Sequence, residues 1–234
     1  MRADLRATAW LIGLSVIALL LAGGIASAGG KNKRKPPAWV KIPSIPDKDQ
    51  QKGAKGDGKA EAKGNTDPDY LLCVAADRGE LGEVKPLVEG KGAHVSSAQN
   101  RECSPVAIAA VQGDVALIEY LLAKGAKIDE RQGEEKWTAM HFAANWARPD
   151  IIKYLLSKGA DVNVRDKDLN APIHLAIDQY NPMNDDSLKT IEVLVNAKGF
   201  DRNARNGEGR TPSEWAIVKD CKDVARYIET KKWI

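Results

Sequence analysis

The side chains of this chain that could do chemistry are few and widely spaced. The 234 residues include three cysteines and three histidines. The cysteines form no Cys-x-x-Cys pair and the histidines show no metal-binding spacing, so the sequence does not predict a zinc site. No serine or cysteine lies in a motif that pairs it with a histidine, as nucleophilic catalysis would need. We therefore expect a protein that is not an enzyme and that has no cofactor and no metal.

One segment mimics the start of a calcium-binding loop. It runs Asp166-Lys167-Asp168-Leu169-Asn170. Such a loop needs Gly at its sixth place and Glu at its twelfth. Ala171 and Ile177 occupy those places, so we interpret the segment as a turn between helices.

The N-terminus has the features of a secretory signal. Arg2 and Arg6 flank a basic start, an apolar run follows from residue 10 to 22, and Ala26-Ser27-Ala28 offers the small-x-small pattern of a cleavage site. We predict a signal peptide over residues 1–28, cleaved near Ala28. The alternative is an uncleaved anchor, for which the apolar run is short.

Residues 29–66 are rich in Lys, Pro and Gly. Such a composition buries too little apolar surface to offset the entropy of ordering, so we predict a disordered basic tether. Within it, Ala38-Trp39-Val40-Lys41-Ile42-Pro43 is more apolar and could dock on something. The net charge of the whole chain is only +3, which does not favour nucleic acid as a partner.

From residue 67 onward one pattern returns five times. Its clearest copy has Thr138 at a helix start, the pair Ala143-Ala144, and then an apolar helix that ends at Gly159-Ala160. Ser or Thr caps a helix, Pro fits its first turn, and Gly ends it where φ is positive. The predicted units are residues 67–99, 100–133, 134–166, 167–205 and 206–234.

This pattern resembles the ankyrin repeat, a unit of about 33 residues with a turn and two helices. The resemblance covers residues 67–234 and implies an all-α solenoid of about five helix-turn-helix repeats with hairpin-like tips between them. It also implies a surface that holds protein partners and carries no chemistry by default. The first and last copies are more polar, as terminal repeats should be, and we expect a monomer.

The resemblance places the binding side chains at the tips and at the ends of the first helices. Trp137 and Trp146 are expected to point out of the core and to contact the partner, although either could instead be a structural lid. Trp215 is expected in the core. The predicted partner-binding residues are Trp146, Trp137, Asn145, Glu134, Glu135, Gln112, Arg101, Lys167, Asp168, Asp178, Gln179, Tyr180, Met183 and Arg210.

The fourth unit contains an insertion over residues 179–187. It falls between two helices and maps to a loop at one side of the array, where such loops often bind partners. Tolerated surface insertions are the alternative. Tyr180 and Met183 favour a use in binding.

The resemblance also assigns roles to the reactive residues. His141 and His174 fall on the family's structural histidines, which hydrogen-bond a neighbouring turn, while His94 is expected alone and exposed. Adjacent repeats stack, so a Cys73–Cys103 disulfide is predicted. Cys221 has no obvious partner.

The size and layout are similar to exported ankyrin proteins of bacteria that bind and inhibit cell-wall hydrolases for self-protection. We therefore expect a periplasmic or secreted protein with a protein partner, no nucleic acid and no stable membrane insertion after signal cleavage. One alternative is a scaffold linked to catalase and peroxide resistance, in which the cysteines act as redox groups. Another is an immunity protein against an incoming toxin.

Overall fold

The computed structural model describes residues 67–96 and 103–233. The predicted signal peptide and tether lie outside the described residues, and so does Arg101. The domain limits stay a prediction. In the described part of the chain, all regular elements are α-helices, and the one β-type pairing is an isolated bridge between Gln132 and Trp137.

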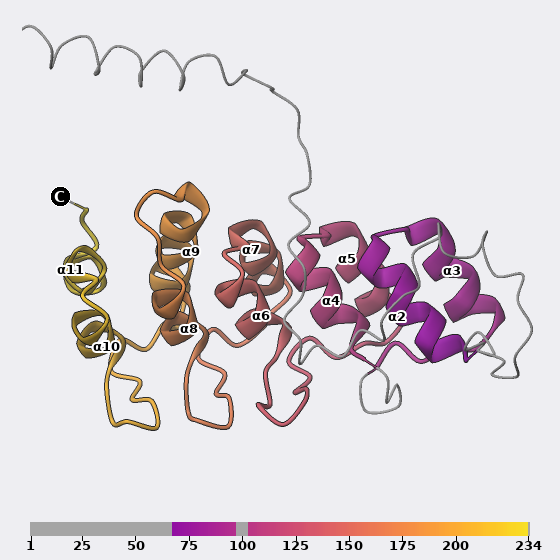
Figure 1. Cartoon of the computed structure of the whole chain (residues 1–234), viewed down its shortest axis with the longest axis horizontal. Coiled ribbons are helices and arrows are strands. Elements are labelled where there is room, and N and C mark those ends of the chain that lie inside the picture. Colours follow the sequence, from indigo (N-terminus) through magenta and orange to yellow (C-terminus); the bar gives the residue numbers. More distant parts are fainter. Residues whose placement is uncertain (1–66, 97–102, 234) are drawn as a thin grey trace, which may run out of the picture. The chain divides into compact units, whose positions relative to one another are not determined.

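The helices form five consecutive pairs, labelled as in Figure 1. The first member of each pair is called the inner helix here, and the second the outer helix. The inner helices are α2 (Pro68–Arg78), α4 (Pro105–Gln112), α6 (Ala139–Asn145), α8 (Pro172–Asp178) and α10 (Pro212–Val218). The outer helices are α3 (Leu81–Gly90), α5 (Val115–Ala123), α7 (Pro149–Ser157), α9 (Asp185–Asn196) and α11 (Lys222–Thr230).

Two of the inner helices, α4 and α10, begin at a side-chain cap that the sequence predicts. Ser104 Oγ accepts a hydrogen bond from the backbone N–H of Ala107 at 3.3 Å. Thr211 and Glu214 cap each other's backbone, with distances of 3.3 Å and 2.8 Å. These bonds satisfy donors that the first turn of a helix otherwise leaves unpaired.

A tight turn joins inner to outer helix. Gly79 and Gly113 hold this turn with φ of 68° and 77°, in the left-handed region that glycine reaches without strain. In the third pair Ala147 adopts φ 50° at the equivalent position, and in the fifth pair Asp220 adopts φ 58°. Ala147 therefore carries a backbone strain that the first two pairs avoid.

The pairs stack in chain order, because each inner helix packs against the inner helix of the next pair (Figure 1). The paired alanines make this close approach possible: Ala109, Ala110, Ala143 and Ala144 are all buried. Trp215 is buried as predicted. The predicted all-α arrangement of helix-turn-helix units is confirmed.

Hairpin-like tips connect α5 to α6, α7 to α8 and α9 to α10 (Figure 1). In the tip before α8, Asp166 is buried and its Oδ1 accepts the backbone N–H groups of Asp168 and Asn170 at 2.9 Å and 2.8 Å. In the next tip Asn206 makes the same two bonds, to Glu208 and Arg210. The calcium-like segment is therefore a turn in which the aspartate closes the backbone.

Candidate protein-binding surface

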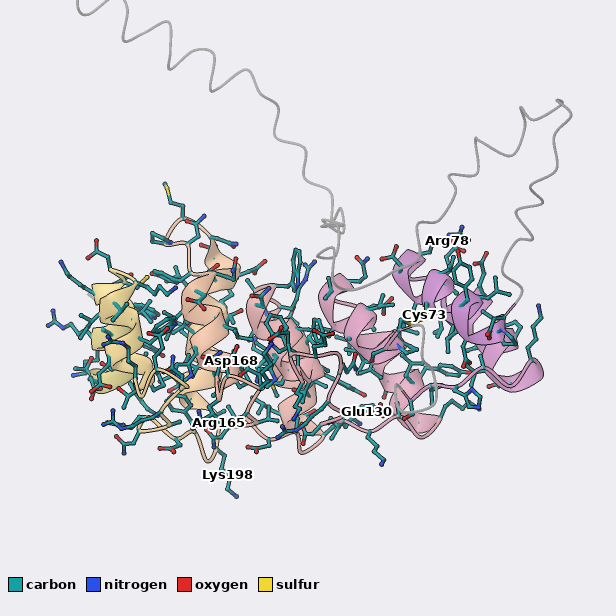
Figure 2. The ribbon with its side chains drawn as sticks, turned by 60° about the horizontal axis from the view of Figure 1, so that its bottom comes forward. Cys73, Arg78, Glu130, Arg165, Asp168 and Lys198 are labelled. Atoms are coloured by element: carbon teal, nitrogen blue, oxygen red, sulfur yellow. A yellow bond between two sulfur atoms is a disulfide. The ribbon has the colours of Figure 1, made fainter. Side chains whose placement is uncertain are left out.

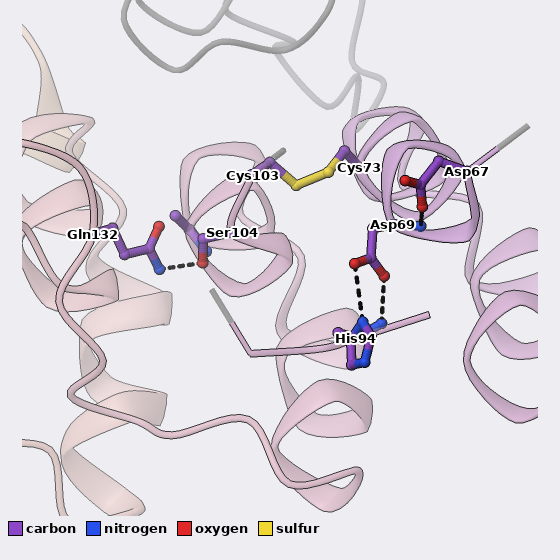
Figure 3. Close-up of a disulfide and its surroundings, with 8 residues drawn as sticks. Asp67, Asp69, Cys73, His94, Cys103, Ser104 and Gln132 are labelled. Carbon is purple, nitrogen blue, oxygen red and sulfur yellow. Dashed lines mark hydrogen bonds and ion pairs between the residues drawn. A yellow bond between two sulfur atoms is a disulfide. The ribbon is translucent and has the colours of Figure 1, made fainter. Parts of the chain in front are cut away.

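A covalent bond links the first two repeats. Cys73 on α2 and Cys103 form a disulfide, with an S–S distance of 2.07 Å and their Cα atoms 6.0 Å apart (Figure 3). Cys103 directly precedes Ser104, the cap of α4. The bond thus joins the first turns of one inner helix to the start of the next.

Two histidines link neighbouring inner helices at the equivalent place further along the stack. His141 stands at the position of Cys73 in its own repeat, and its Nε2 donates to the carbonyl of Asn170 at 3.1 Å. His174 donates likewise to the carbonyl of Arg210 at 3.3 Å. Asn170 and Arg210 each precede the cap of the next inner helix, as Cys103 does. Three junctions are therefore closed at one equivalent place, by a disulfide or by a histidine.

The hydrogen bonds of these histidines determine which ring nitrogen carries the proton. A carbonyl can only accept, so Nε2 carries the hydrogen, and Nδ1 of His141 accepts the backbone N–H of Thr138 at 3.2 Å. Burial lowers the pKa of His141 to about 4. Burial also lowers the pKa of His174. Both rings are neutral structural links, and neither is poised as a catalytic base near pH 7.

His94 is exposed, as expected, but it is not alone. Its backbone N–H donates to one carboxylate oxygen of Asp69 at 2.6 Å, and its Nδ1 lies 3.0 Å from the other (Figure 3). Asp69 belongs to the first turn of α2. His94 therefore ties the segment after α3 back to the start of the same repeat.

The expectation that both tryptophans point out of the core is wrong. Trp137 is half-buried, with its ring centroid 5.3 Å from that of Phe142 and 6.3 Å from that of His141. Trp146 is also half-buried against the core, and its indole Nε1 is buried with no hydrogen-bond partner among the described residues. The physical reason is that an indole ring gains more from covering a nearby apolar cluster than from remaining in water.

Several predicted binding residues are engaged between repeats. Gln112 donates to Asp77 at 2.8 Å, which ties α4 to α2. Asp178 accepts from the Trp215 indole at 3.1 Å and pairs with Lys219 at 2.8 Å. These side chains stabilise the stack, so only part of each is open to a partner.

Three further predicted residues are held by contacts between repeats. The hydroxyl of Tyr180 donates to the carboxylate of Asp223, which lies on α11. Lys167 pairs with Glu135 at 2.9 Å across two tips. The pair is exposed and contributes little to stability.

The other predicted residues differ in exposure. Asn145 is half-buried. The exposed ones are Glu134, Asp168, Gln179, Met183 and Arg210. Exposure leaves these five available, and their role in binding stays a prediction.

Sequence reasoning overlooked an arginine in the tips. Arg165, labelled in Figure 2, donates through Nη1 to the carbonyl of Arg205 in the next tip at 3.0 Å and to the carbonyl of Leu169 in its own tip at 2.5 Å. Arg131, Arg165 and Arg205 recur at one position of three successive repeats. This recurrence was the signal that could have identified the residue.

The remaining cysteine is a poor nucleophile. Cys221 is free and half-buried. Burial, followed by the negative charges of Asp223 and Asp220, raises the pKa of its thiol. Less thiolate is present at neutral pH, and the thiolate is the reactive form.

Across residues 67–96 and 103–233, no group of three or more His, Cys, Asp or Glu side chains is placed to hold a metal ion. Over the same ranges, every helix is too short or too polar to cross a bilayer.

Comparison with known proteins identifies the repeats. Residues 72–166 match the family model described as "Ankyrin repeats (3 copies)". The chain is 31% identical over 96 residues to the Neurogenic locus Notch protein of Drosophila melanogaster. This match covers 41% of this chain and 3% of the Notch protein. It is 34% identical over 68 residues to the human Ankyrin repeat domain-containing protein 49. This match covers 29% of this chain and 28% of the human protein. The chain thus spans less than a third of either relative.

Proposed function

We propose that this chain, whose residues 72–166 match an ankyrin-repeat family model, is an exported, non-enzymatic module that binds a peptidoglycan hydrolase and inhibits it for self-protection. The statement that the chain is a protein–protein interaction module rests on its repeats. Ankyrin-repeat proteins are in general interaction modules without enzymatic activity.

The observation that carries the exported part of the proposal is the disulfide. Cys73 and Cys103 are bonded in a repeat stack that has an apolar core of its own. Disulfides form and persist in oxidising compartments and are rare in the cytosol. The bond therefore favours the periplasm or the extracellular space, in agreement with the signal peptide that the sequence predicts.

The inhibitory part is supported by the loop between α8 and α9. Met183 in this loop is 91% exposed, and its backbone N–H donates to the side chain of Asn181 at 2.9 Å. An apolar side chain on a loop held in shape suits insertion into an enzyme's cleft. The choice of a peptidoglycan hydrolase rests on the similarity of layout to exported bacterial inhibitors.

The proposal is tested by capture followed by an activity assay. The mature chain is immobilised, periplasmic extract of the source organism is passed over it, and retained proteins are identified. We expect one cell-wall hydrolase, whose release of soluble muropeptides falls to background with an equimolar amount of the chain. An unaltered rate of muropeptide release with every retained protein would overturn the inhibitory role. Retention and neutralisation of a foreign toxin would instead support the immunity alternative.

The peroxide alternative is disfavoured by the state of the cysteines. Two of them are locked in the disulfide, and the third has a raised pKa. A peroxide sink needs an accessible thiolate; the disulfide removes two thiols, and the raised pKa of Cys221 lowers the thiolate fraction of the third.

A further inference from the structure

In each of the first four repeats, one polar side chain lies four residues after the glycine that follows the outer helix. These residues are Ser96, Asp129, Asn163 and Asn203. Asparagine and aspartate have almost the same shape but differ at one atom, because an amide nitrogen donates a hydrogen bond and an ionised carboxylate oxygen can only accept one. The aspartate is therefore the member of this set whose bonding depends on pH.

Asn163 shows how a side chain at this position links two repeats. Its Oδ1 accepts the backbone N–H of Asp201 at 2.9 Å, and its Nδ2 donates to the carbonyl of Gly199 at 2.7 Å. Asn163 follows α7, whereas both partners follow α9. One amide thus bonds a donor and an acceptor of the next repeat, and it joins the third repeat to the fourth.

Asp129 makes only half of this link, between the second and third repeats. Its Oδ2 accepts the backbone N–H of Asp161 at 3.2 Å, as Asn163 Oδ1 accepts that of Asp201. Its Oδ1 is buried and has no hydrogen-bond partner among the described residues. This oxygen corresponds to the donating nitrogen of Asn163, and the equivalent of Gly199 is Gly159. An ionised Asp129 has no hydrogen to donate to that carbonyl.

The same junction also lacks the link between inner helices. Ala107 stands where other repeats have Cys73 or a histidine. Two side-chain bonds cross the junction elsewhere: Gln132 donates to the cap residue of α4, and Arg148 donates to the carbonyl of Val111 at 2.8 Å. Neither bond reaches the segments after α5 and α7, which Asp129 joins.

The surroundings of Asp129 disfavour its negative charge. Its side chain is half-buried, and burial raises the pKa of the carboxyl. The backbone N–H of Asp161 lowers this pKa in part, and the negative charge of Asp161 raises it further. In the same segment Lys127 is exposed, and Glu130 accepts a hydrogen bond from Ser96 at 2.5 Å.

The charged side chains of the flanking elements are engaged elsewhere. Lys124, which follows α5, pairs with a glutamate on α3 at 2.9 Å. Lys158, which follows α7, lies over the ring of Tyr154 with its nitrogen 5.3 Å from the ring centroid. In the preceding repeat, the ring of His94 bonds Asp69. The carboxylate of Asp129 is thus not neutralised by these side chains.

We propose that Asp129 is a proton-operated link between the second and third repeats. Protonation places a hydrogen on Oδ1, which then donates to the Gly159 carbonyl as the Asn163 amide donates to that of Gly199, and loss of the proton breaks this bond. The link belongs to the repeat stack itself, so it does not rest on the identity of the partner.

The pH dependence of this link is opposite in sign to that of His141. The pKa of Asp129 is raised in the folded chain above the ordinary value of 3.8, so between these two values the folded chain binds more protons than the unfolded chain. The stability that the link contributes is therefore complete below pH 3.8 and is lost as the pH rises through the raised pKa. Acid strengthens this junction and weakens the next one, which His141 closes.

The first test compares the mature chain with its Asp129→Asn variant, whose amide carries the donor at every pH. Melting temperatures are measured at pH 7 and at pH 4. We expect the variant to melt about 2–4 °C higher than the native chain at pH 7, and this gain to fall by at least about half at pH 4. Both chains contain His141, so its acid effect cancels in the difference.

The chain offers a matched transplant and a matched control. Asn163→Asp places the same carboxylate at the next junction, so it should melt about 2–4 °C below the native chain at pH 7 and recover part of this loss at pH 4. Asp150→Asn removes a carboxylate whose side chain is 85% exposed, and it should shift the melting temperature by about 1 °C or less at either pH.

Carboxyl-carbon NMR of the native chain follows the proton directly and needs no variant to fold. The carboxyl of Asp129 should titrate above 3.8, and titration at or below this value would overturn the proposal. A gain from Asp129→Asn that is equal at pH 7 and pH 4 would also overturn it, because a link without a proton switch gives that result. The hydrolase assay is separate, so its failure leaves this test intact.

Discussion

The junction between the first two repeats and the junctions between the last three are closed at the same place by different chemistry. Cys73 makes a covalent bond to Cys103, whereas His141 and His174 each donate a hydrogen bond to a backbone carbonyl. In the second repeat Ala107 takes this position and has no side chain that could make such a link. One repeat architecture therefore depends on oxidation at one end and on a neutral imidazole at the other.

The largest effect should come from breaking the covalent junction. The variant Cys73→Ala, Cys103→Ala, or the native chain under reductant, should lose about 2–4 kcal/mol of unfolding free energy, because the open chain regains conformational entropy. Urea unfolding monitored by circular dichroism measures this. Identical transition midpoints for the oxidised and reduced chains would contradict the role given to the disulfide.

The second largest effect should come from acid, which lowers the unfolding free energy contributed by the histidine junctions. The folded-state pKa of His141 is about 4, while an unfolded histidine titrates near its ordinary value of 6.5, so below that value the unfolded chain binds more protons. The stability contributed by neutral His141 is therefore complete above pH 6.5 and is lost as the pH falls towards about 4. The expected loss is on the order of 2–3 kcal/mol.

The matched control for the acid effect is His141→Gln. Its amide can still bond the Asn170 carbonyl but does not titrate in this range. The fall in urea midpoint between pH 6.5 and pH 4 should be smaller in this variant than in the native chain. An equally steep fall in both would show that other groups cause the acid effect.

The smallest expected effect on stability concerns the interhelical turns of the first three repeats. Ala147 holds φ at 50° where the first two repeats have glycine. Ala147→Gly should raise stability by up to about 1 kcal/mol, since glycine adopts this conformation without strain. The reverse change, Gly113→Ala, should lower it by about 1 kcal/mol. A thermal shift of the same sign in both variants would contradict this explanation.

The sequence predicted what depends on local spacing. Cap residues such as Ser104 and Thr211 and turn glycines such as Gly113 act within a few residues, so the helix pairs could be placed without a structure. The pairing of Cys73 with Cys103 also follows from the repeat, because stacking brings each inner helix close to the start of the next one. That pairing is present in the structure.

The sequence could not predict what depends on neighbours. The direction of the Trp146 side chain at the end of α6 is decided by the apolar cluster within its reach. Ile217 fits the same helical pattern as Ile177, and only the absence of a covering element in the described residues exposes it. For the same reason the sequence placed Asp178 and Tyr180 on a binding surface, while the structure gives them partners in the fifth repeat.

The most direct test of the difference between the two regions is hydrogen–deuterium exchange of the mature chain with and without reductant at pH 7. We predict that reduction speeds amide exchange in α2, α3 and α4, whose junction holds the disulfide, and leaves α8 to α11 unchanged. Faster exchange throughout the stack, or no change in α2 to α4, would contradict the claim that the two ends are held by independent chemistry.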